Sequence, residues 1–328
     1  MIVSIVIPVY NEAGNIIPVY ERTLEVLRGL NVDYEFIFTD NHSTDTSFQD
    51  LRQLAERDNR VRVIRFSKNF GFQKSILTGY LAASGDVAIQ LDCDLQDPPE
   101  LIPEFLARWR DGFRVVNGVR RSRPEGWWIS TARKLFYRLI NLLSEEDLPL
   151  DVGDFRLVDR CVLEELRLID DQQPYLRGTI ALFGFAQCGV AYDRAGRARG
   201  ESKFPLHKLI GLAVDGILNH SLIPLRIATG TGIFMSALAV FGGLGYLVGK
   251  IYFGMDWPPG FATTVLLLML GIGLNSFFLG IIGEFVGRIY RQVKRRPLVV
   301  VECELNRKSS GSGTERVGPR PQGAESES

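Results

Sequence analysis

The stretch Val87 to Glu100, VAIQLDCDLQDPPE, contains the features that decide the fold. The apolar run from Val87 to Leu91 predicts a short buried strand, and the pair Pro98-Pro99 predicts the start of a helix. A strand that leads through a polar loop into a helix is typical of α/β proteins. We therefore expect the polar residues between the two elements to lie beyond the carboxyl end of a strand.

Three carboxylates, Asp92, Asp94 and Asp97, occupy this loop. In open α/β sheets, ligands bind at the carboxyl ends of the strands. Carboxylates together with a carboxamide such as that of Gln96 are oxygen ligands suited to Mg²⁺ or Mn²⁺. The loop therefore predicts a site for a metal-chelated diphosphate. Taken alone, the pattern is more often a turn in which Asp94 or Asp97 caps the next helix, so the rest of the chain has to decide.

The N-terminal part of the chain repeats the alternation of apolar runs and helical patterns. The preceding apolar runs are Ile2 to Val9, Tyr34 to Thr39 and Val61 to Phe66. A segment with helical spacing follows each of them, and these segments reach about Leu30, Asp58 and Ala83. Strands that alternate with helices indicate βαβ units and a mostly parallel sheet.

Weaker signals follow Glu100. A helix from about Pro99 to Arg110 and a strand from Val115 to Val119 come first. The pattern then predicts an amphipathic helix over Ile129 to Leu143, a further helix opened by Asp151 to Arg156, and a late strand within Phe183 to Tyr192. These elements extend the α/β body toward about residue 202.

Composition excludes some classes of function. The net charge of the 328 residues is +0, which gives no global reason to expect nucleic acid as a partner. The four cysteines are far apart and lack metal-binding spacing, so we expect free thiols in a reducing compartment. None of the three histidines has a catalytic or metal-binding spacing. Because Met1 runs directly into a strand pattern, we expect no signal peptide and a cytoplasmic N-terminal domain.

Two uncharged apolar runs, about 227–249 and 261–283, follow this body. Each is long enough for a bilayer core of about 30 Å. Basic residues flank the pair and are scarce in the short turn between the runs, which predicts two membrane-spanning helices with both termini in the cytoplasm. The alternative is a buried helical hairpin of a soluble protein.

The expected division of the chain has four parts. Residues 1–202 form the cytoplasmic α/β domain, and 203–225 form a moderately apolar helix in the membrane interface. The two spans occupy 226–290. A basic segment and a disordered tail, rich in Ser, Gly and Pro, occupy 291–328.

Several ordered motifs now combine with the acidic loop into a resemblance. They are SIVIPVYNE (Ser4 to Glu12), TDNHSTD (Thr39 to Asp45), FSKNFGFQKSILTGY (Phe66 to Tyr80), QLDCDLQDPPE (Gln90 to Glu100), GDFRLVDR (Gly153 to Arg160) and GESKF (Gly200 to Phe204). Together with the two apolar runs, they resemble the family 2 glycosyltransferases that use polyprenyl phosphate. Within these, the chain is most similar to the bactoprenol glucosyltransferases, which are relatives of dolichol-phosphate mannose synthase. The resemblance extends to about Arg296.

The resemblance implies a GT-A fold, a Rossmann-like α/β domain with a mostly parallel sheet, followed by a two-helix transmembrane hairpin. It also implies a metal-dependent, inverting transfer of a hexose from a nucleotide sugar, UDP-glucose above all, to undecaprenyl phosphate. The metal, Mg²⁺ or Mn²⁺, would be held by Asp94 and Gln96, and Asp40 would address the base. The residues expected to contact the donor are Pro8, Tyr10, Glu12, Asp40, Lys68, Asp92, Arg197, Ser202 and Lys203.

The chain departs from the family pattern at a few positions. Asn41 stands where a second aspartate is frequent, and Cys93 stands where alanine is usual. Arg199 is also unusual within RARGESKF. The first departure bears on nucleotide selectivity, and the second changes little in size.

General chemistry supports this kind of transfer. A sugar diphosphate breaks more readily when a divalent cation neutralises the leaving group. A phosphomonoester acceptor is already anionic near pH 7, because its second pKa is about 6, so cationic contacts that hold it in line matter more than a strong base. The residues expected to act in catalysis are Asp92, Asp94, Arg120, Arg123, Arg133 and Asp154, with Lys203 as a further cation for the acceptor.

Two of these assignments have structural alternatives. The arginines also fit a solvated basic face that touches anionic lipid headgroups. Asp154 would contact a sugar hydroxyl or orient an arginine, or it would only cap the helix expected after it.

Other functions remain open at this point. The same chemistry fits another donor such as GDP-mannose. A non-catalytic membrane scaffold or a lipid flippase is a hypothesis from a different class, although two helices without charged residues offer no lined pathway. A processive polysaccharide synthase would need more spans. The glycine-rich apolar runs permit close helix packing, and the resemblance favours a homotetramer.

Overall fold

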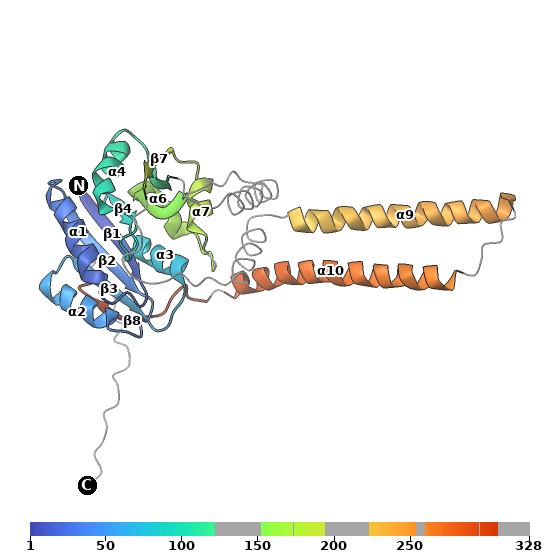
Figure 1. The fold of residues 1–328 in the computed structure, drawn as a ribbon, viewed down its shortest axis with the longest axis horizontal. Helices are drawn as coiled ribbons and strands as arrows, with labels where there is room; N and C mark the ends of the chain where they lie inside the picture. Colours follow the sequence, from blue (N-terminus) through green and yellow to red (C-terminus); the bar gives the residue numbers. More distant parts are fainter. Residues whose placement is uncertain (122–151, 173, 194–222, 254–259, 295, 308–328) are drawn as a thin grey trace, which may run out of the picture. The chain divides into compact units, whose positions relative to one another are not determined.

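The computed structural model describes residues 1–121, 152–172, 174–193, 223–253, 260–294 and 296–307 (Figure 1). The chain divides into two compact units. The first, called the sheet unit here, comprises Met1–Pro124, Pro149–Glu201 and Arg296–Ser328. The second, called the helical unit, comprises Glu125–Leu148 and Ser202–Arg295.

One eight-stranded sheet, of order β7-β5-β6-β4-β1-β2-β3-β8, organises the sheet unit. Its strands are β1 Ile2–Val9, β2 Asp33–Asp40, β3 Val61–Phe66, β4 Val87–Gln90, β5 Val115–Arg120, β6 Val152–Asp159, β7 Gln187–Tyr192 and β8 Val301–Leu305. The pairs β1/β2, β1/β4, β2/β3 and β5/β7 are parallel, whereas β6 and β8 pair antiparallel with their neighbours. The sheet is therefore mostly parallel at its centre, as the sequence predicts.

Helices cover both faces of this sheet. They are α1 Ile16–Arg28, α2 Ser47–Arg57, α3 Phe72–Ala82, the 3₁₀ turn η1 Pro99–Leu101, α4 Ile102–Arg110, α6 Arg160–Leu168 and α7 Leu176–Leu182. One apolar core joins the sheet to α1, α2 and α4, and the other joins it to α3, α6 and α7. Because side chains of a strand alternate between faces, Ile5 and Ile7 enter the first core while Val6 enters the second. The two cores fix the strand ends that carry the site.

Glycine brings α3 close to the sheet. A Cβ at Gly79 would overlap the side chain of Val6 on β1. The backbone of α3 therefore approaches β1 more closely than any larger residue allows. This packing places the first residues of α3 beside the ends of β1 and β2.

Strand β6 corrects one sequence prediction. The segment Asp151 to Arg156 was expected to open a helix, but Val152–Asp159 is a strand between β4 and β5. The residues from Gly153 to Asp159 are all buried, as an inserted central strand requires. The helix begins only at Arg160, where the Asp159 carboxylate accepts a hydrogen bond from the Cys161 N–H (2.8 Å). The capping aspartate is therefore Asp159.

Strand β8 was not predicted. It lies within 291–328, for which the sequence indicated only a basic segment and a tail, and it pairs antiparallel with β3 at the edge of the sheet. Its pattern, VECEL, is too short and too polar to stand out. The last strand of the other edge, β7, begins at Gln187 because α7 extends to Leu182.

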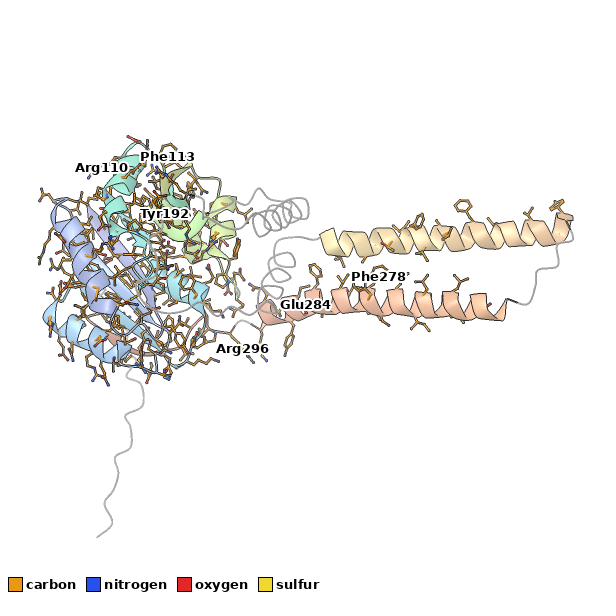
Figure 2. The ribbon with its side chains drawn as sticks, in the orientation of Figure 1. Arg110, Phe113, Tyr192, Phe278, Glu284 and Arg296 are labelled. Carbon is orange, nitrogen blue, oxygen red and sulfur yellow. The ribbon has the colours of Figure 1, made fainter. Side chains whose placement is uncertain are left out.

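The helical unit contains two long helices, α9 Ile223–Phe253 and α10 Phe261–Val293, which run antiparallel and contact each other (Figure 1). Large apolar side chains are exposed along both, among them Phe241 at 72% and Ile272 at 65%. Within the described residues, one stretch, Leu270–Gly287, is long and apolar enough to cross a membrane, and none of it is buried. The stretch overlaps the second predicted span, 261–283, and includes Glu284, which is labelled in Figure 2.

The other predicted elements of this region are not described. The expected amphipathic helix over 129–143 and the interfacial helix over 203–225, up to residue 222, lie outside the described residues. The first predicted span, 227–249, falls within α9 and stays a prediction as a membrane span.

Candidate functional site

A cavity of about 380 Å³ lies at the carboxyl ends of the central parallel strands β1, β2 and β4. Its lining residues are Pro8, Val9, Tyr10, Glu12, Asn41, Asn69, Gly71, Phe72, Asp92, Cys93 and Asp94. Five of the residues predicted from sequence to contact donor or metal, Pro8, Tyr10, Glu12, Asp92 and Asp94, therefore share one cavity. This is the position at which open α/β sheets bind ligands.

The loop after β1 is held by the loop after β2. The backbone N–H groups of Asn11 and Glu12 donate to the hydroxyls of Ser43 (3.0 Å) and Ser47 (2.9 Å). In return, the Asn11 carboxamide accepts from the N–H of Thr44 (2.8 Å). The contacts on the second loop come from short polar residues of TDNHSTD and from Ser47 just after it. Their effect is to fix Tyr10 and Glu12 on the wall of the cavity.

Asp92 lies in a crowd of negative charge. Burial, with repulsion by Asp97, Asp94 and Asp154, raises the pKa of Asp92 to about 7, although a hydrogen bond from Gln90 opposes the shift. That bond runs from Gln90 Nε2 to Asp92 Oδ1 (2.8 Å). A cation in the cavity would relieve the repulsion, so the local charge favours a bound cation.

Asp94 and Gln96 have the chemistry of ligands for a hard cation. Asp94 Oδ1 accepts from the backbone N–H of Gln96 (3.1 Å), and Leu95 between them has a φ of 58°. Gln96 is 7% exposed, and its Oε1 is buried without a hydrogen-bond partner among the described residues. A buried carbonyl oxygen without a donor is costly unless something binds it. A divalent cation would satisfy this oxygen.

The described residues offer no set of three or more His, Cys, Asp or Glu side chains arranged to hold a metal. A cation at Asp94 and Gln96 would therefore complete its shell with oxygens of a ligand and of water, as Mg²⁺ commonly does. This donor set fits a metal that binds together with a diphosphate.

Arg120 and Asp97 lie beside the acidic group. Asp97 is fully buried and accepts a hydrogen bond from the hydroxyl of Tyr192 on β7, which is labelled in Figure 2. Arg120 Nη2 lies 3.9 Å from Asp97 Oδ1. Although burial disfavours the charge of Arg120, its hydrogen bond with Tyr192 and attraction by Asp97 and Asp92 raise its pKa. Arg120 therefore supplies a fixed positive charge next to the site.

Asp154 pairs with an arginine. On β6, it accepts two hydrogen bonds from Arg177 of α7, at 2.9 Å from Nε and 2.7 Å from Nη2. Burial opposes ionisation, but Arg177 and Arg156 hold the pKa of Asp154 below its usual value. The helix-capping alternative is wrong, because Asp154 lies inside a strand. A Cβ at Gly153 would lie 3.1 Å from the Arg120 guanidinium, so the small residue before Asp154 leaves room for that arginine.

At the end of β2, Asp40 is buried in the fold and Asn41 lines the cavity. Asp40 is fully buried and is not among the residues that line the cavity. Its carboxylate accepts from the Ser43 N–H (2.9 Å) and from Arg65 Nη1 (3.1 Å). Asn41 lines the cavity and bonds the backbone of Phe70 and Gly71, so it joins β2 to the loop before α3.

Other predicted residues lie farther from this geometry or outside it. Lys68 places its ammonium 5.1 Å from the ring centroid of Phe70, in the loop before α3. Arg123, Arg133, Arg197, Ser202 and Lys203 lie outside the described residues, as does Arg199. Cys93 lines the cavity and is 3% exposed, consistent with a small residue in that position.

Four residues escaped the sequence analysis, and two of them, Phe72 and Gln90, had a local signal. Phe72 is 43% exposed and lines the cavity, and it follows Gly71, whose φ of 96° marks the start of α3. Gln90 occupies the last strand position before Asp92, where a buried amide suggests a partner. Arg177 and Tyr192 come from elements distant in sequence, so only the fold brings them to the site.

The arrangement suits a ligand that carries both an aromatic base and a diphosphate. The exposed aromatic side chains of Tyr10 and Phe72 line the cavity together with carboxylates that favour a cation. The N-terminus of α3 faces the same cavity through Gly71. Helix N-termini favour negatively charged groups.

Comparisons with known proteins identify the family. Residues 4–167 match the family model described as glycosyl transferase family 2. The chain is 39% identical to the uncharacterized glycosyltransferase YkcC of Bacillus subtilis (strain 168) over 303 residues, covering 91% of this chain and 93% of that protein. It is 34% identical to the SfII prophage-derived bactoprenol glucosyl transferase of Shigella flexneri over 304 residues, covering 92% and 98%.

Among solved structures, the glucosyl-3-phosphoglycerate synthase of Mycobacterium tuberculosis, in complex with Mn²⁺, UDP-glucose and phosphoglyceric acid, aligns at 24% identity and a TM-score of 0.43. The alignment covers 66% of this chain and 77% of that chain. The sheet unit has a GT-A-like α/β fold with a mostly parallel sheet. From the family match and the relatives that span nearly the whole chain, the chain belongs to glycosyl transferase family 2.

Proposed function

We propose that this glycosyltransferase transfers glucose from UDP-glucose to a polyprenyl phosphate, such as undecaprenyl phosphate, and yields polyprenyl-phosphate glucose. The observation that carries the proposal is the cavity in which the acidic loop of β4 meets the aromatic and acidic residues that follow β1. Relatives named bactoprenol glucosyl transferase, similar over 92% of this chain, support glucose as the sugar and a lipid carrier as the acceptor.

The donor would bind across the carboxyl ends of β1, β2 and β4. Tyr10 and Phe72 offer aromatic surfaces to the base. Asp92 would accept a hydrogen bond from a hydroxyl group of the ribose or of the sugar. Asn41 replaces the frequent second aspartate and lines the cavity, so it would contribute to the choice of the base.

Asp94 and Gln96 would hold a Mg²⁺ or Mn²⁺ ion, which when bound neutralises the leaving diphosphate as a Lewis acid. The support for this assignment is the buried Gln96 Oε1 without a hydrogen-bond partner and the negative charge around Asp92. Gln90 would keep the Asp92 carboxylate oriented toward the cavity.

The acceptor would attack as a phosphate oxygen that is already anionic. A bond forms between this oxygen and the anomeric carbon while the bond from that carbon to the UDP oxygen breaks, so the anomeric configuration inverts and no proton has to move. Arg120, fixed beside Asp97 and Tyr192, would attract the acceptor phosphate, and Asp154 would act through Arg177. Arg123, Arg133 and Lys203 remain proposed cations for the same phosphate, and Arg197 and Ser202 remain proposed donor contacts.

The helical unit would place the enzyme at the membrane. The exposed apolar stretch Leu270–Gly287 of α10 supports one span, and the exposed apolar side chains of α9 support a second. Both termini would lie in the cytoplasm. A cysteine introduced at Asp256 should then react with a membrane-impermeant thiol reagent added outside intact cells, and protection of that cysteine would contradict the topology. A homotetramer is the proposed assembly, and cross-linking in detergent tests it.

The donor is tested by supplying purified full-length protein in detergent with UDP-glucose or GDP-mannose, undecaprenyl phosphate and Mn²⁺, and by identifying the lipid product by mass spectrometry. A hexosyl lipid from UDP-glucose alone is the expected result. Product from GDP-mannose alone would replace glucose by mannose in the proposal. Absence of product from every nucleotide sugar tried would favour a scaffold or flippase.

A further inference from the structure

The C-terminal strand β8 is anchored to the sheet unit at both ends. Before it, Leu298 and Val299 pack against the core that contains α3, and the Val300 carbonyl accepts from the Ser67 N–H (2.9 Å). After it, the carboxamide of Asn306 donates to the carbonyls of Ala55 (2.6 Å) and Val61 (3.0 Å). The chain thus leaves α10 at Val293 and is fixed on the edge of the sheet by residue 301.

Glu302 of this strand begins a chain of polar contacts that ends at the cavity. Its Oε2 accepts from Arg65 Nε (3.0 Å), and Arg65 Nη1 donates to Asp40 Oδ2 (3.1 Å). The other oxygen of Asp40 accepts from the Ser43 N–H (2.9 Å), and the Ser43 hydroxyl accepts from the Asn11 N–H (3.0 Å). Asn11 lies between Tyr10 and Glu12, both of which line the cavity.

Asp40 is buried and Arg65 is partly buried in the middle of this series of polar contacts, so a change in one hydrogen bond should affect its neighbours. Asp40 is fully buried, and Arg65 is 15% exposed with its guanidinium 4.1 Å from the ring centroid of Phe48. A buried carboxylate depends on its counter-charge and its hydrogen bonds. Glu302 sets the orientation of Arg65 because it takes the Nε–H, while Asp40 takes an Nη1–H of the same planar group.

His42 adds a second contact from the same loop. Its Nδ1 lies 3.2 Å from Glu302 Oε2 and 3.1 Å from the carbonyl oxygen of Phe66. Both neighbours are acceptors, so Nδ1 carries the ring proton in this arrangement. Glu302 therefore contacts the loop after β2 through His42 as well as through Arg65.

The strand also carries an internal control. Glu304, two residues further on, accepts from Arg62 Nε (2.6 Å), but Arg62 Nη1 then donates to the carbonyl of Ala82 at the end of α3 (2.9 Å). These contacts do not continue to the cavity. Glu302 and Glu304 thus join the same two strands by the same kind of ion pair, and only Glu302 leads to the cavity.

We propose that Glu302 is a positioning residue for the donor: through Arg65, Asp40 and Ser43 it holds the loop that carries Tyr10 and Glu12, so the strand that follows the membrane helix sets the affinity for the nucleotide sugar. This inference rests on the proposed function, in that the cavity is taken to bind UDP-glucose. The inference adds that donor binding depends on Glu302 as well as on the acidic loop after β4.

The test uses full-length wild type, Glu302→Gln, Glu304→Gln and the conservative Glu302→Asp in detergent. We expect Glu302→Gln to raise the KM for UDP-glucose about 3- to 10-fold and to weaken UDP binding measured by calorimetry by a similar factor. The kcat and the KM for the lipid should stay unchanged. Glu304→Gln should leave all of these values unchanged, and Glu302→Asp should restore part of the affinity.

Three outcomes would overturn the proposal: no change in donor KM for Glu302→Gln, an equal change for Glu304→Gln, or a loss confined to kcat. Thermal melting of each variant identifies any general loss of folding, which Glu302, at 48% side-chain exposure, should not cause. If wild type transfers no glucose, the proposed function fails. Binding of UDP by wild type and Glu302→Gln then still decides whether Glu302 positions the cavity.

Discussion

Two groups of carboxylates lie on one sheet, and arginines balance their charge to different degrees. At the end of β4, Asp92, Asp94 and Asp97 are crowded together, and their repulsion contributes to the raised pKa of Asp92. At the β3/β8 edge, Asp40 and Glu302 share Arg65, and Glu304 pairs with Arg62.

This difference distinguishes carboxylates that favour a bound cation from carboxylates that stabilise the fold. Carboxylates that each have an arginine within the fold lower the free energy of that fold and leave no reason to bind a cation. Three carboxylates crowded around the single guanidinium of Arg120 keep an excess of negative charge, which raises the free energy of the fold until a cation joins them. Substitutions of the crowded carboxylates at the end of β4 should therefore reduce activity. Substitutions of the carboxylates paired with Arg65 and Arg62 should reduce stability, apart from the link through Glu302.

The largest effect is expected at Asp94. Asp94→Ala should lower kcat/KM for glucose transfer by about 10³-fold or more, because the developing charge of the leaving diphosphate loses its cation. The melting temperature without metal should not fall. Asp111→Ala, which removes an exposed carboxylate 3.9 Å from Arg108, is the control and should keep its activity. Retention of full activity by Asp94→Ala would remove the metal assignment.

The end of β4 could be predicted from sequence because its signals are local. An apolar run, three aspartates and two prolines lie within Val87 to Glu100, so strand, loop and helix follow from neighbours in the chain. The pocket residues after β1 were predictable in the same way, since parallel strands bring their carboxyl ends to one edge.

The remaining parts depend on contacts between distant residues. Strand β6 carries Asp154 because the sheet accepts VGDFRLVD between β4 and β5, and no local pattern distinguishes that strand from the start of a helix. Strand β8 forms only because β3 offers an edge. Arg177 and Tyr192 reach the site from α7 and β7.

The second largest effect is expected at Asp154, a buried carboxylate beside the site that is paired with Arg177. Asp154→Ala should lower the free energy of unfolding by about 3 kcal/mol, because Arg156 is buried and loses the carboxylate that lies 3.7 Å from it. Chemical denaturation of the sheet unit within the full chain measures this change. Asp154→Asn also removes the charge and keeps one of the two acceptor oxygens that bond Arg177, so it should lose most of the same stability. Wild-type stability for Asp154→Asn would contradict the role of the charge.

At Asp92, stability and activity should move in opposite directions. Asp92→Asn removes one of the crowded charges and can keep the hydrogen bond from Gln90 Nε2, so the free energy of unfolding in chelator should rise by about 1 kcal/mol. Glucose transfer should fall at the same time. Thermal melting with and without Mn²⁺, measured beside the transfer rate, tests both parts. A lower melting temperature in chelator would mean that Asp92 stabilises the fold.

The smallest effect is expected at Asp58, a carboxylate that is paired with Arg60 and Tyr20 and does not line the cavity. Despite burial, hydrogen bonds from Arg60 and Tyr20 lower the pKa of Asp58 to about 2. A depressed pKa adds stability that is present above the unfolded value near 3.8 and is lost as pH falls toward 2. Between about pH 4 and pH 2, the free energy of unfolding of Asp58→Asn should therefore fall less steeply than that of the wild type, by about 0.5–1 kcal/mol because the pair is partly screened by solvent. An unchanged pH dependence would contradict the pairing.

The central claim is tested most directly by the transfer of radiolabelled glucose from UDP-glucose to undecaprenyl phosphate by the purified full-length chain, with Mn²⁺ and then with excess chelator. The account predicts labelled lipid that requires both the acceptor and the metal. Labelled lipid formed at the same rate in chelator would contradict the role given to the crowded carboxylates. No labelled lipid from a folded protein would contradict the proposed reaction.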